Sequence, residues 1–67
     1  MEHLTENQKD LIKLLYYSEI ETPLIAGIVT MMEDDKKLIE LVNWMIDNRE
    51  QIKDKVLEKA LEICKLI

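Results

Sequence analysis

The chain has 67 residues, of which 48% are hydrophobic and 34% are charged, with one glycine, one proline, one cysteine and no phenylalanine. A chain this short forms a single domain, residues 1–67, and its few helix-breaking residues favour an all-α fold. The single cysteine excludes a disulfide within the chain, and the formal net charge of −5 disfavours nucleic acid and anionic membranes as partners.

The first predicted helix begins with a capping box, Thr5-Glu6-Asn7-Gln8, and runs to about Ser18. In this motif the Thr5 hydroxyl and the Gln8 side chain satisfy free backbone N–H groups reciprocally. Tyr17 and Ile20 are expected to point away from the apolar face of the helix. That face is predicted to consist of Leu11, Ile12, Leu14, Leu15 and Tyr16.

The second predicted helix, from about Pro23 to Met32, carries no charged residue. Thr22 is suited to be its N-cap, and Pro23 at the first helical position loses no hydrogen bond. A helix that is apolar nearly all round is normally buried. Its small residues would also let another backbone approach closely, and these are Ala26, Gly27 and Thr30.

The acidic run over residues 33–35 suits the positive N-terminus of a third helix, predicted from about Asp35 to Asp47. Trp44 falls off the apolar stripe of this helix. The stripe is predicted to consist of Leu38, Ile39, Leu41, Val42, Met45 and Ile46.

The next boundary is weakly marked, because the apolar pattern continues from Met45 to Ile52 without a glycine or proline. One helix over residues 35–67 is therefore the alternative to two. We favour a break at which the Asn48 side chain caps Gln51. The last helix then buries Ile52, Val56, Leu57, Ala60, Leu61, Ile63, Cys64 and Ile67.

Several segments together resemble short all-helical proteins of low-GC Gram-positive bacteria, some of them encoded near mobile elements. These segments are the opening residues 4–9, Gly27-Ile28, the Trp44 helix and residues 57–63. Members of that group carry a proline and a capping threonine after the tryptophan-bearing helix, where this chain has residues 48–51. The resemblance implies an all-helical fold and a bacterial setting, and no particular activity.

The residues that could carry catalysis are isolated from one another. His3, the only histidine, precedes the first cap in a segment expected to fray. Cys64 lies on an apolar face near a helix C-terminus, whereas a reactive thiolate needs a neighbouring cation or a helix N-terminus. Ser18, the only serine, has no histidine close to it in the sequence. We therefore predict a non-enzymatic protein.

The acidic clusters do not have the spacing of metal sites. Residues 33–35 lack the alternating ligands and central glycine of a calcium loop, and the chain has no Glu-x-x-His pair for a di-iron bundle. A single glycine cannot form a phosphate-binding loop. We predict no metal, no cofactor and no small-molecule substrate.

The sequence also predicts the cellular location of the protein. The start of the chain, residues 1–10, is polar and unlike a secretory signal. The longest apolar stretch, residues 24–32, is far shorter than the roughly 20 residues of a membrane span. With a lone thiol, this favours the cytoplasm.

A domain this small buries only about 60% of the surface of its unfolded chain, so a second subunit is a common reinforcement. We expect a compact bundle of three to four short helices, completed by dimerisation if one copy cannot cover helix two. The alternative is that helix two is simply the centre of the core. The candidate interface, for a homodimer or another protein partner, is Leu24, Ile25, Ala26, Gly27, Ile28, Thr30, Met31, Met32 and Trp44.

The charge distribution suggests what the partner would be. Residues 1–35 hold eight acids against two lysines, a net charge of −6, whereas residues 36–67 carry a net charge of +1. The hypothesis is an acidic inhibitor or adaptor that acts on a basic protein. Its candidate acidic patch is Glu19, Glu21, Glu33, Asp34 and Asp35. The alternative is a small nucleic-acid-binding regulator that uses Lys53, Lys55 and Lys59 of the last helix.

Overall fold

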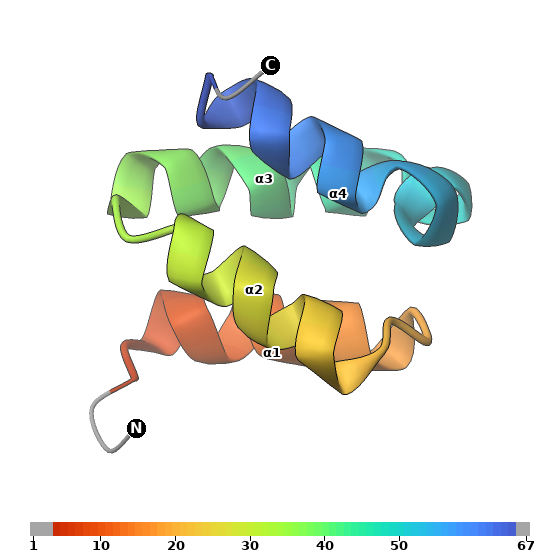
Figure 1. Cartoon of the computed structure of the whole chain (residues 1–67), viewed down its shortest axis with the longest axis horizontal. Helices are drawn as coiled ribbons and strands as arrows, with labels where there is room; N and C mark the ends of the chain where they lie inside the picture. Colours follow the sequence, from red (N-terminus) through yellow and green to blue (C-terminus); the bar gives the residue numbers. More distant parts are fainter. Residues whose placement is uncertain (1–3, 66–67) are drawn as a thin grey trace.

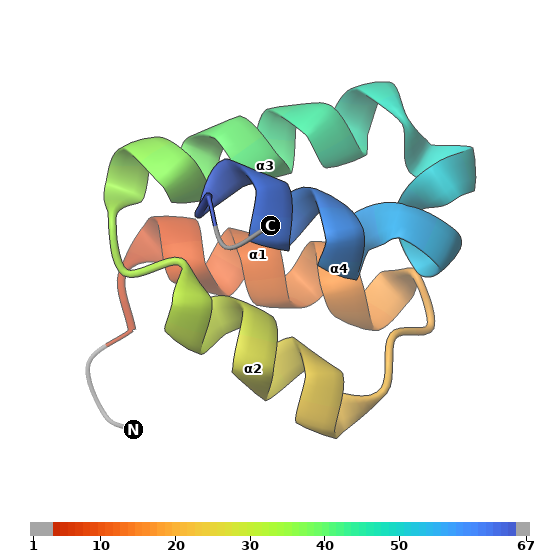
Figure 2. The ribbon, with the colours of Figure 1, turned by 45° about the horizontal axis from the view of Figure 1, so that its top comes forward.

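The computed structural model describes residues 4–65, which form four α-helices and no strand (Figure 1). α1 and α3 run in about the same direction, and α2 and α4 run in the opposite direction, with α2 packed beside α1 and α4 beside α3 (Figure 2). This arrangement confirms the expected all-α bundle of short helices. The elements are α1 (Glu6–Tyr17), α2 (Thr22–Met31), α3 (Asp35–Asp47), the single 3-10 turn η1 (Arg49–Gln51) and α4 (Ile52–Ile63). The predictions for His3 and Ile67 lie outside the described residues.

The predicted capping box starts α1. The backbone N–H of Gln8 donates to the Thr5 hydroxyl at 3.1 Å, and the backbone N–H of Thr5 donates to Oε1 of Gln8 at 2.9 Å. Two of the N–H groups that a helix start leaves free are thereby satisfied.

The end of α1 corrects the prediction for its last residues. Glu19 adopts a φ of 64°, and the Ile20 N–H donates to the Leu15 carbonyl at 3.1 Å. This is a Schellman turn, which characteristically packs the residue after the left-handed position against the helix. Ile20 is consequently buried rather than pointing elsewhere. Tyr16, which was expected on the buried face, is 68% exposed.

α2 begins one residue earlier than predicted. Glu21 is the N-cap and makes no side-chain hydrogen bond, whereas Thr22 is the first helical residue. The prediction of Thr22 as N-cap is therefore wrong. Pro23 lies in the first turn, where its missing N–H has no intrahelical partner to lose.

α3 has the predicted bounds, and the predicted break before α4 is present. Asp34 caps α3 by accepting the Lys36 N–H at 2.8 Å. The role predicted for Asn48 is wrong, because its Nδ2 donates backwards to the Trp44 carbonyl at 2.8 Å and closes the end of α3. The following turn is closed by the backbone, with the Gln51 N–H donating to the Asn48 carbonyl at 2.9 Å.

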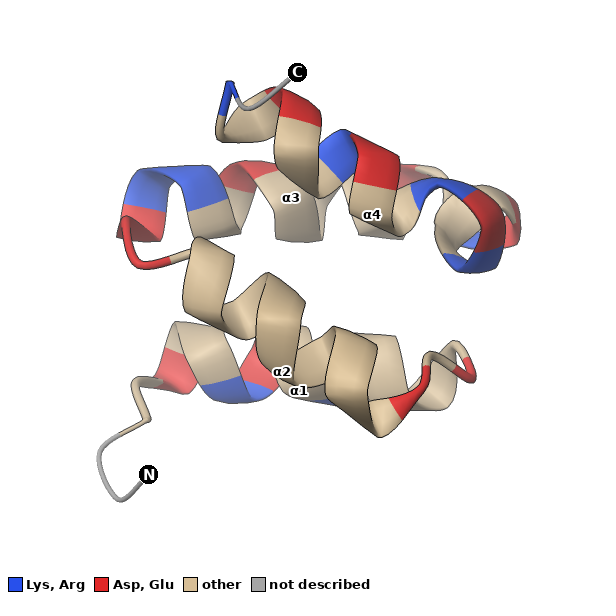
Figure 3. Ribbon diagram, viewed as in Figure 1, with Lys and Arg blue, Asp and Glu red and all other residues tan. Residues whose placement is uncertain are grey.

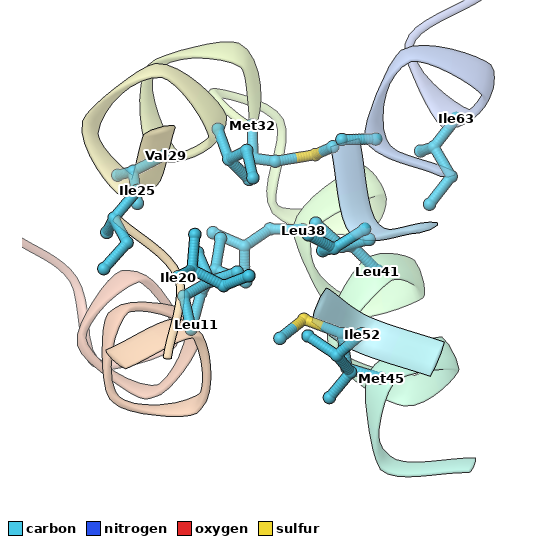
Figure 4. Close-up of a cluster of buried hydrophobic side chains, with 14 residues drawn as sticks. Leu11, Ile20, Ile25, Val29, Met32, Leu38, Leu41, Met45, Ile52 and Ile63 are labelled. Carbon is cyan, nitrogen blue, oxygen red and sulfur yellow. The ribbon is translucent and has the colours of Figure 1, made fainter. Parts of the chain in front are cut away.

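All four helices contribute apolar side chains to one core, and Figure 4 shows these side chains converging between the helices. The side chains of α2 that point inward are covered within a single copy of the chain. Residues with no exposed surface at all include Leu11, Leu15, Ile28, Met32, Leu41, Met45 and Ala60.

Candidate interaction surface

Apolar side chains of α1 and α3 meet at a solvent-exposed edge of the bundle. Tyr17 at the end of α1 is 78% exposed, and Ile46 near the end of α3 is 47% exposed. Leu14 and Val42 line the same hollow and are half-buried. Ile39, which is 44% exposed, continues the row along α3. We call these five residues the α1–α3 strip.

Two adjoining hollows mark the strip. The first has a volume of about 360 Å³ and lies between α1 and α3. The second has a volume of about 380 Å³ and lies where the end of α1 meets η1 and the start of α4. Leu14 and Tyr17 line both of them, so the Tyr17 side chain borders both hollows. A partner side chain could therefore pack on either side of this ring.

The helical repeat explains why the strip is exposed. At 100° per residue, the six apolar residues predicted for the α3 stripe span about 160° of its circumference. α3 packs against α1 and α4, and these neighbours bury only the part of the stripe formed by Leu38, Leu41 and Met45. The edge left over has a spacing of three and then four residues, and it consists of Ile39, Val42 and Ile46.

The rim of the strip carries both signs of charge, although the chain as a whole is acidic. Asp10 and Lys13 border the first hollow, and Glu19, Arg49 and Lys53 border the second. These two acids and three bases make the rim slightly basic in a chain of net charge −5. The ion pairs within residues 4–65 are Lys9–Glu6 and Lys59–Glu62 and involve none of the five.

The fold divides the interface predicted on helix two into a buried and an exposed part. Leu24 and Met31 are half-buried and pack against the core. Three further residues of the predicted interface lie inside the core and are therefore not available on the surface of this chain: Ile25, Ile28 and Met32. The residues that remain exposed are small: Ala26, Gly27 and Thr30. This face of α2 offers little apolar area, and a Cβ atom at position 27 would meet nothing within 4 Å.

Trp44 lies apart from that small face of α2. Its side chain is half-buried and packs at the edge of the core, as expected for a tryptophan off the main stripe. The hollow beside it is bordered by polar side chains of η1 and α4, among them Lys55, Glu58 and Lys59. The structure therefore does not join Trp44 and the exposed part of α2 into one surface.

The predicted acidic patch is split between two loops. Its residues are all exposed, but Glu19 and Glu21 precede α2 whereas Glu33, Asp34 and Asp35 follow it. Figure 3 shows these acidic segments at opposite ends of α2, which itself carries no charge. The ten residues of α2 separate them by roughly 15 Å.

The three lysines of the nucleic-acid alternative do not form one basic surface either. Lys53 borders the hollow beside Tyr17, whereas Lys55 and Lys59 border the hollow beside Trp44. Lys59 also donates to Glu62 at 3.2 Å. The last helix thus presents interleaved charges of both signs where phosphate binding would require a continuous row of cations.

The remaining chemical groups are placed as follows. Cys64 is a free, half-buried cysteine whose thiol donates to the Met31 carbonyl at 3.6 Å. Ser18 borders the second hollow at the end of α1. Within residues 4–65 no three His, Cys, Asp or Glu side chains are grouped so that they could hold a metal ion. None of the helices in that part of the chain has the length and apolar character needed to cross a membrane.

Comparison with known proteins yields no relative from which a function could be carried over. The chain matches no protein-family model, no curated protein and no solved structure. The resemblance to short helical proteins of Gram-positive bacteria therefore stays a prediction. Within residues 4–65 the α1–α3 strip contains three of the large hydrophobic residues that are exposed, Tyr17, Ile39 and Ile46. The others are Tyr16 and Leu57, and the prediction that Leu57 is buried is therefore wrong.

Proposed function

We propose that the chain is a non-enzymatic helical module that binds another protein chain through the α1–α3 strip. The observation that carries the proposal is the joint exposure of Tyr17 and Ile46 on the two sides of one hollow. Tyrosine is among the residues that contribute most to binding energy in protein interfaces, where its ring packs into a pocket.

The magnitudes support binding through apolar contact. Burying the exposed half of an isoleucine contributes about 1 kcal/mol, and Ile39 and Ile46 each offer about that much. The exposed part of Tyr17 amounts to roughly 150 Å² of additional surface. Leu14 and Val42 line the same hollow and are half-buried, so they add to this apolar surface. Exposed apolar patches on small proteins often have a function.

The strip is a better candidate than the small face of α2. Ala26 and Gly27 have almost no apolar side chain to bury, so a partner there would gain mainly from close backbone approach. The acidic loops at the two ends of α2 lie outside the strip, and in this proposal they steer the approach of a partner rather than form the contact. The proposal includes a cytoplasmic location, which suits the free thiol of Cys64.

Site-specific photocrosslinking tests the proposal with a matched control inside the chain. Tyr16 and Tyr17 are adjacent and similarly exposed, and their rings are 5.8 Å apart. Only Tyr17 lines the two hollows. A photoreactive phenylalanine analogue at position 17 should form covalent adducts with a protein in living cells, and the same analogue at position 16 should form far fewer. Equal yields at both positions, or none at either, would contradict the proposal.

A further inference from the structure

We propose that the break between α3 and α4 is a hinge, and that straightening of this hinge lets two copies of the chain exchange α4. In the exchanged form, residues 35–63 make one continuous helix, and the α4 half of each copy packs on α2 and α3 of the other. Domain swapping of this kind forms a dimer at low cost, because the second copy restores the contacts that α4 makes within one copy. The inference does not depend on what the α1–α3 strip binds.

The residues of the break are compatible with a continuous helix. Residues 47–51 are Asp-Asn-Arg-Glu-Gln and include neither glycine nor proline. Asn48 departs from helical geometry, with a φ of −132° and a ψ of 45°. On the far side of the break, Gln51 and Ile52 are already in the right-handed helical region. We therefore place the hinge at Asn48.

The hydrogen bonds of the break are an irregular set that a continuous helix would replace. The Asn48 N–H donates to the Met45 carbonyl at 3.3 Å, and the Gln51 N–H donates to the Asn48 carbonyl at 2.9 Å. The Trp44 carbonyl accepts the Asn48 side chain. In an α-helix each N–H donates to the carbonyl four residues before it. Straightening of the hinge would give these backbone groups regular helical partners and release the Asn48 side chain.

The apolar residues of α3 and α4 have the phase of one helix. On a continuous helix at 100° per residue, the buried residues of both elements lie within about 100° of the circumference. Arg49 and, at one edge, Lys59 are the polar residues on this stripe. A turn allows any rotation between the two helices that it joins, so a hairpin does not require a common phase. The buried residues of the stripe are Leu38, Leu41, Met45, Ile52, Val56, Ala60 and Ile63.

α4 is held on the rest of the chain by contacts that a second copy can reproduce. It packs on α3 and α2, and Figure 4 shows Ile52 and Ile63 among the side chains of the core. Cys64 follows α4, and its thiol donates to the Met31 carbonyl at 3.6 Å. The ion pairs within residues 4–65 lie inside α1 and inside α4, so none of them ties α4 to another helix. The α4 of a second copy would therefore find the same site.

Substitutions in the hinge test the proposal with a matched control. Asn48→Ala removes the hydrogen bond to the Trp44 carbonyl and raises the helix propensity of the hinge. It should raise the association constant of the dimer at least roughly tenfold, because each dimer contains the change twice. Asn43→Ala makes the same change at an exposed position within α3, which is helical in both forms, and should leave the association constant unchanged.

Arg49→Pro should have the opposite effect. Proline suits the first position of η1 but not the interior of a continuous helix, so this variant should remain monomeric. Sedimentation equilibrium up to millimolar concentration measures the association constant of each variant. The samples are first equilibrated with mild heating, because α4 must leave its own copy before it can be exchanged. Circular dichroism verifies that each variant is helical.

A short crosslink between thiols shows whether α4 has been exchanged. Met31→Cys places a second thiol beside Cys64, and dibromobimane joins thiols that lie close together. Dimers isolated by gel filtration should give a covalent product of twice the chain mass, whereas monomers should give a linked product of single mass. Cys64→Ser in the same background is the control and should abolish both products. The crosslink is applied to the native hinge as well as to Asn48→Ala, so the test does not depend on that variant alone.

Two results would overturn the proposal. One is a chain with Asn48→Ala that associates no more strongly than the chain with Asn43→Ala. The other is a dimer fraction whose crosslinked product has the mass of a single chain, because its copies would then touch without exchanging α4. Neither result bears on the proposed function, which the Tyr17 photocrosslink tests separately.

Discussion

Replacement of Ile46 and of Leu41 by alanine should have very different effects on stability, although both residues belong to the apolar stripe of α3. Leu41 has no exposed surface, and a fully buried leucine replaced by alanine costs about 2–5 kcal/mol. The whole stability of a domain this small rarely exceeds about 3–5 kcal/mol. Leu41→Ala should therefore be largely unfolded in water.

Ile46→Ala should remain folded. The side chain is 47% exposed, so about half of the apolar burial of an isoleucine is lost, which is about 1 kcal/mol. The higher helix propensity of alanine recovers a few tenths of a kcal/mol of that cost. Urea unfolding followed by circular dichroism at low protein concentration measures the free energy of unfolding of both variants. For Ile46→Ala, the slope of this free energy against urea concentration should equal that of the wild-type chain.

The same measurement links stability to association. A partner that buries Ile46 stabilises the folded chain by mass action, so the cost of Ile46→Ala should grow when that partner is present. A cost of several kcal/mol for Ile46→Ala without the partner would show that Ile46 is buried within one copy. That outcome would refute the assignment of an exposed strip.

Three smaller changes test local features of the fold by thermal or urea unfolding. Gly27→Ala should stabilise the chain by about 1 kcal/mol, because α2 is helical there and a new Cβ meets open space. It should leave the yield of the Tyr17 photocrosslink unchanged, whereas a reduced yield would place the contact on α2. Glu19→Gly should stabilise by up to about 1 kcal/mol, because glycine adopts the φ of 64° without the strain of a Cβ atom, and a loss of stability would show that Glu19 makes a compensating contact. Thr5→Ala should cost about 0.5–2 kcal/mol through loss of the capping box, and no change in midpoint would mean that the start of α1 is frayed in solution.

The fold was largely predictable because the residues that begin its helices act locally. The capping box at Thr5, the carboxylate at Asp34 and the proline at position 23 act within one helical turn, so their effects can be worked out from neighbouring residues. Ile20 was predicted wrongly, because its position is not determined by neighbouring residues of this kind. Its burial depends on a left-handed residue, and the sequence has glutamate at that position rather than the glycine that usually marks it.

The candidate site was less predictable, because exposure depends on which neighbours a helix has. Periodicity placed Ile39 and Ile46 on the same broad stripe as Leu41 and Met45. It could not show that α1 and α4 would cover one edge of that stripe and leave the other open. Helix two was predicted to be the interface for the same reason, because its uncharged sequence does not show whether it lies at the centre of a core or forms an exposed contact. In this fold Ile28 and Met32 of α2 lie in the core.

The residues of the strip are not those that stability would favour at exposed helical positions. Isoleucine has a lower helix propensity than lysine, glutamine or glutamate, and a half-exposed isoleucine contributes only about 1 kcal/mol of burial within the chain. A long polar side chain at position 39 or 46 could cover the same neighbours with its methylene groups and add solubility. The local fold alone therefore gives little reason for isoleucine at either position. A partner that buries the exposed half of each side chain gives that reason, and Tyr17 across the same hollow from Ile46 offers it a large, rigid contact.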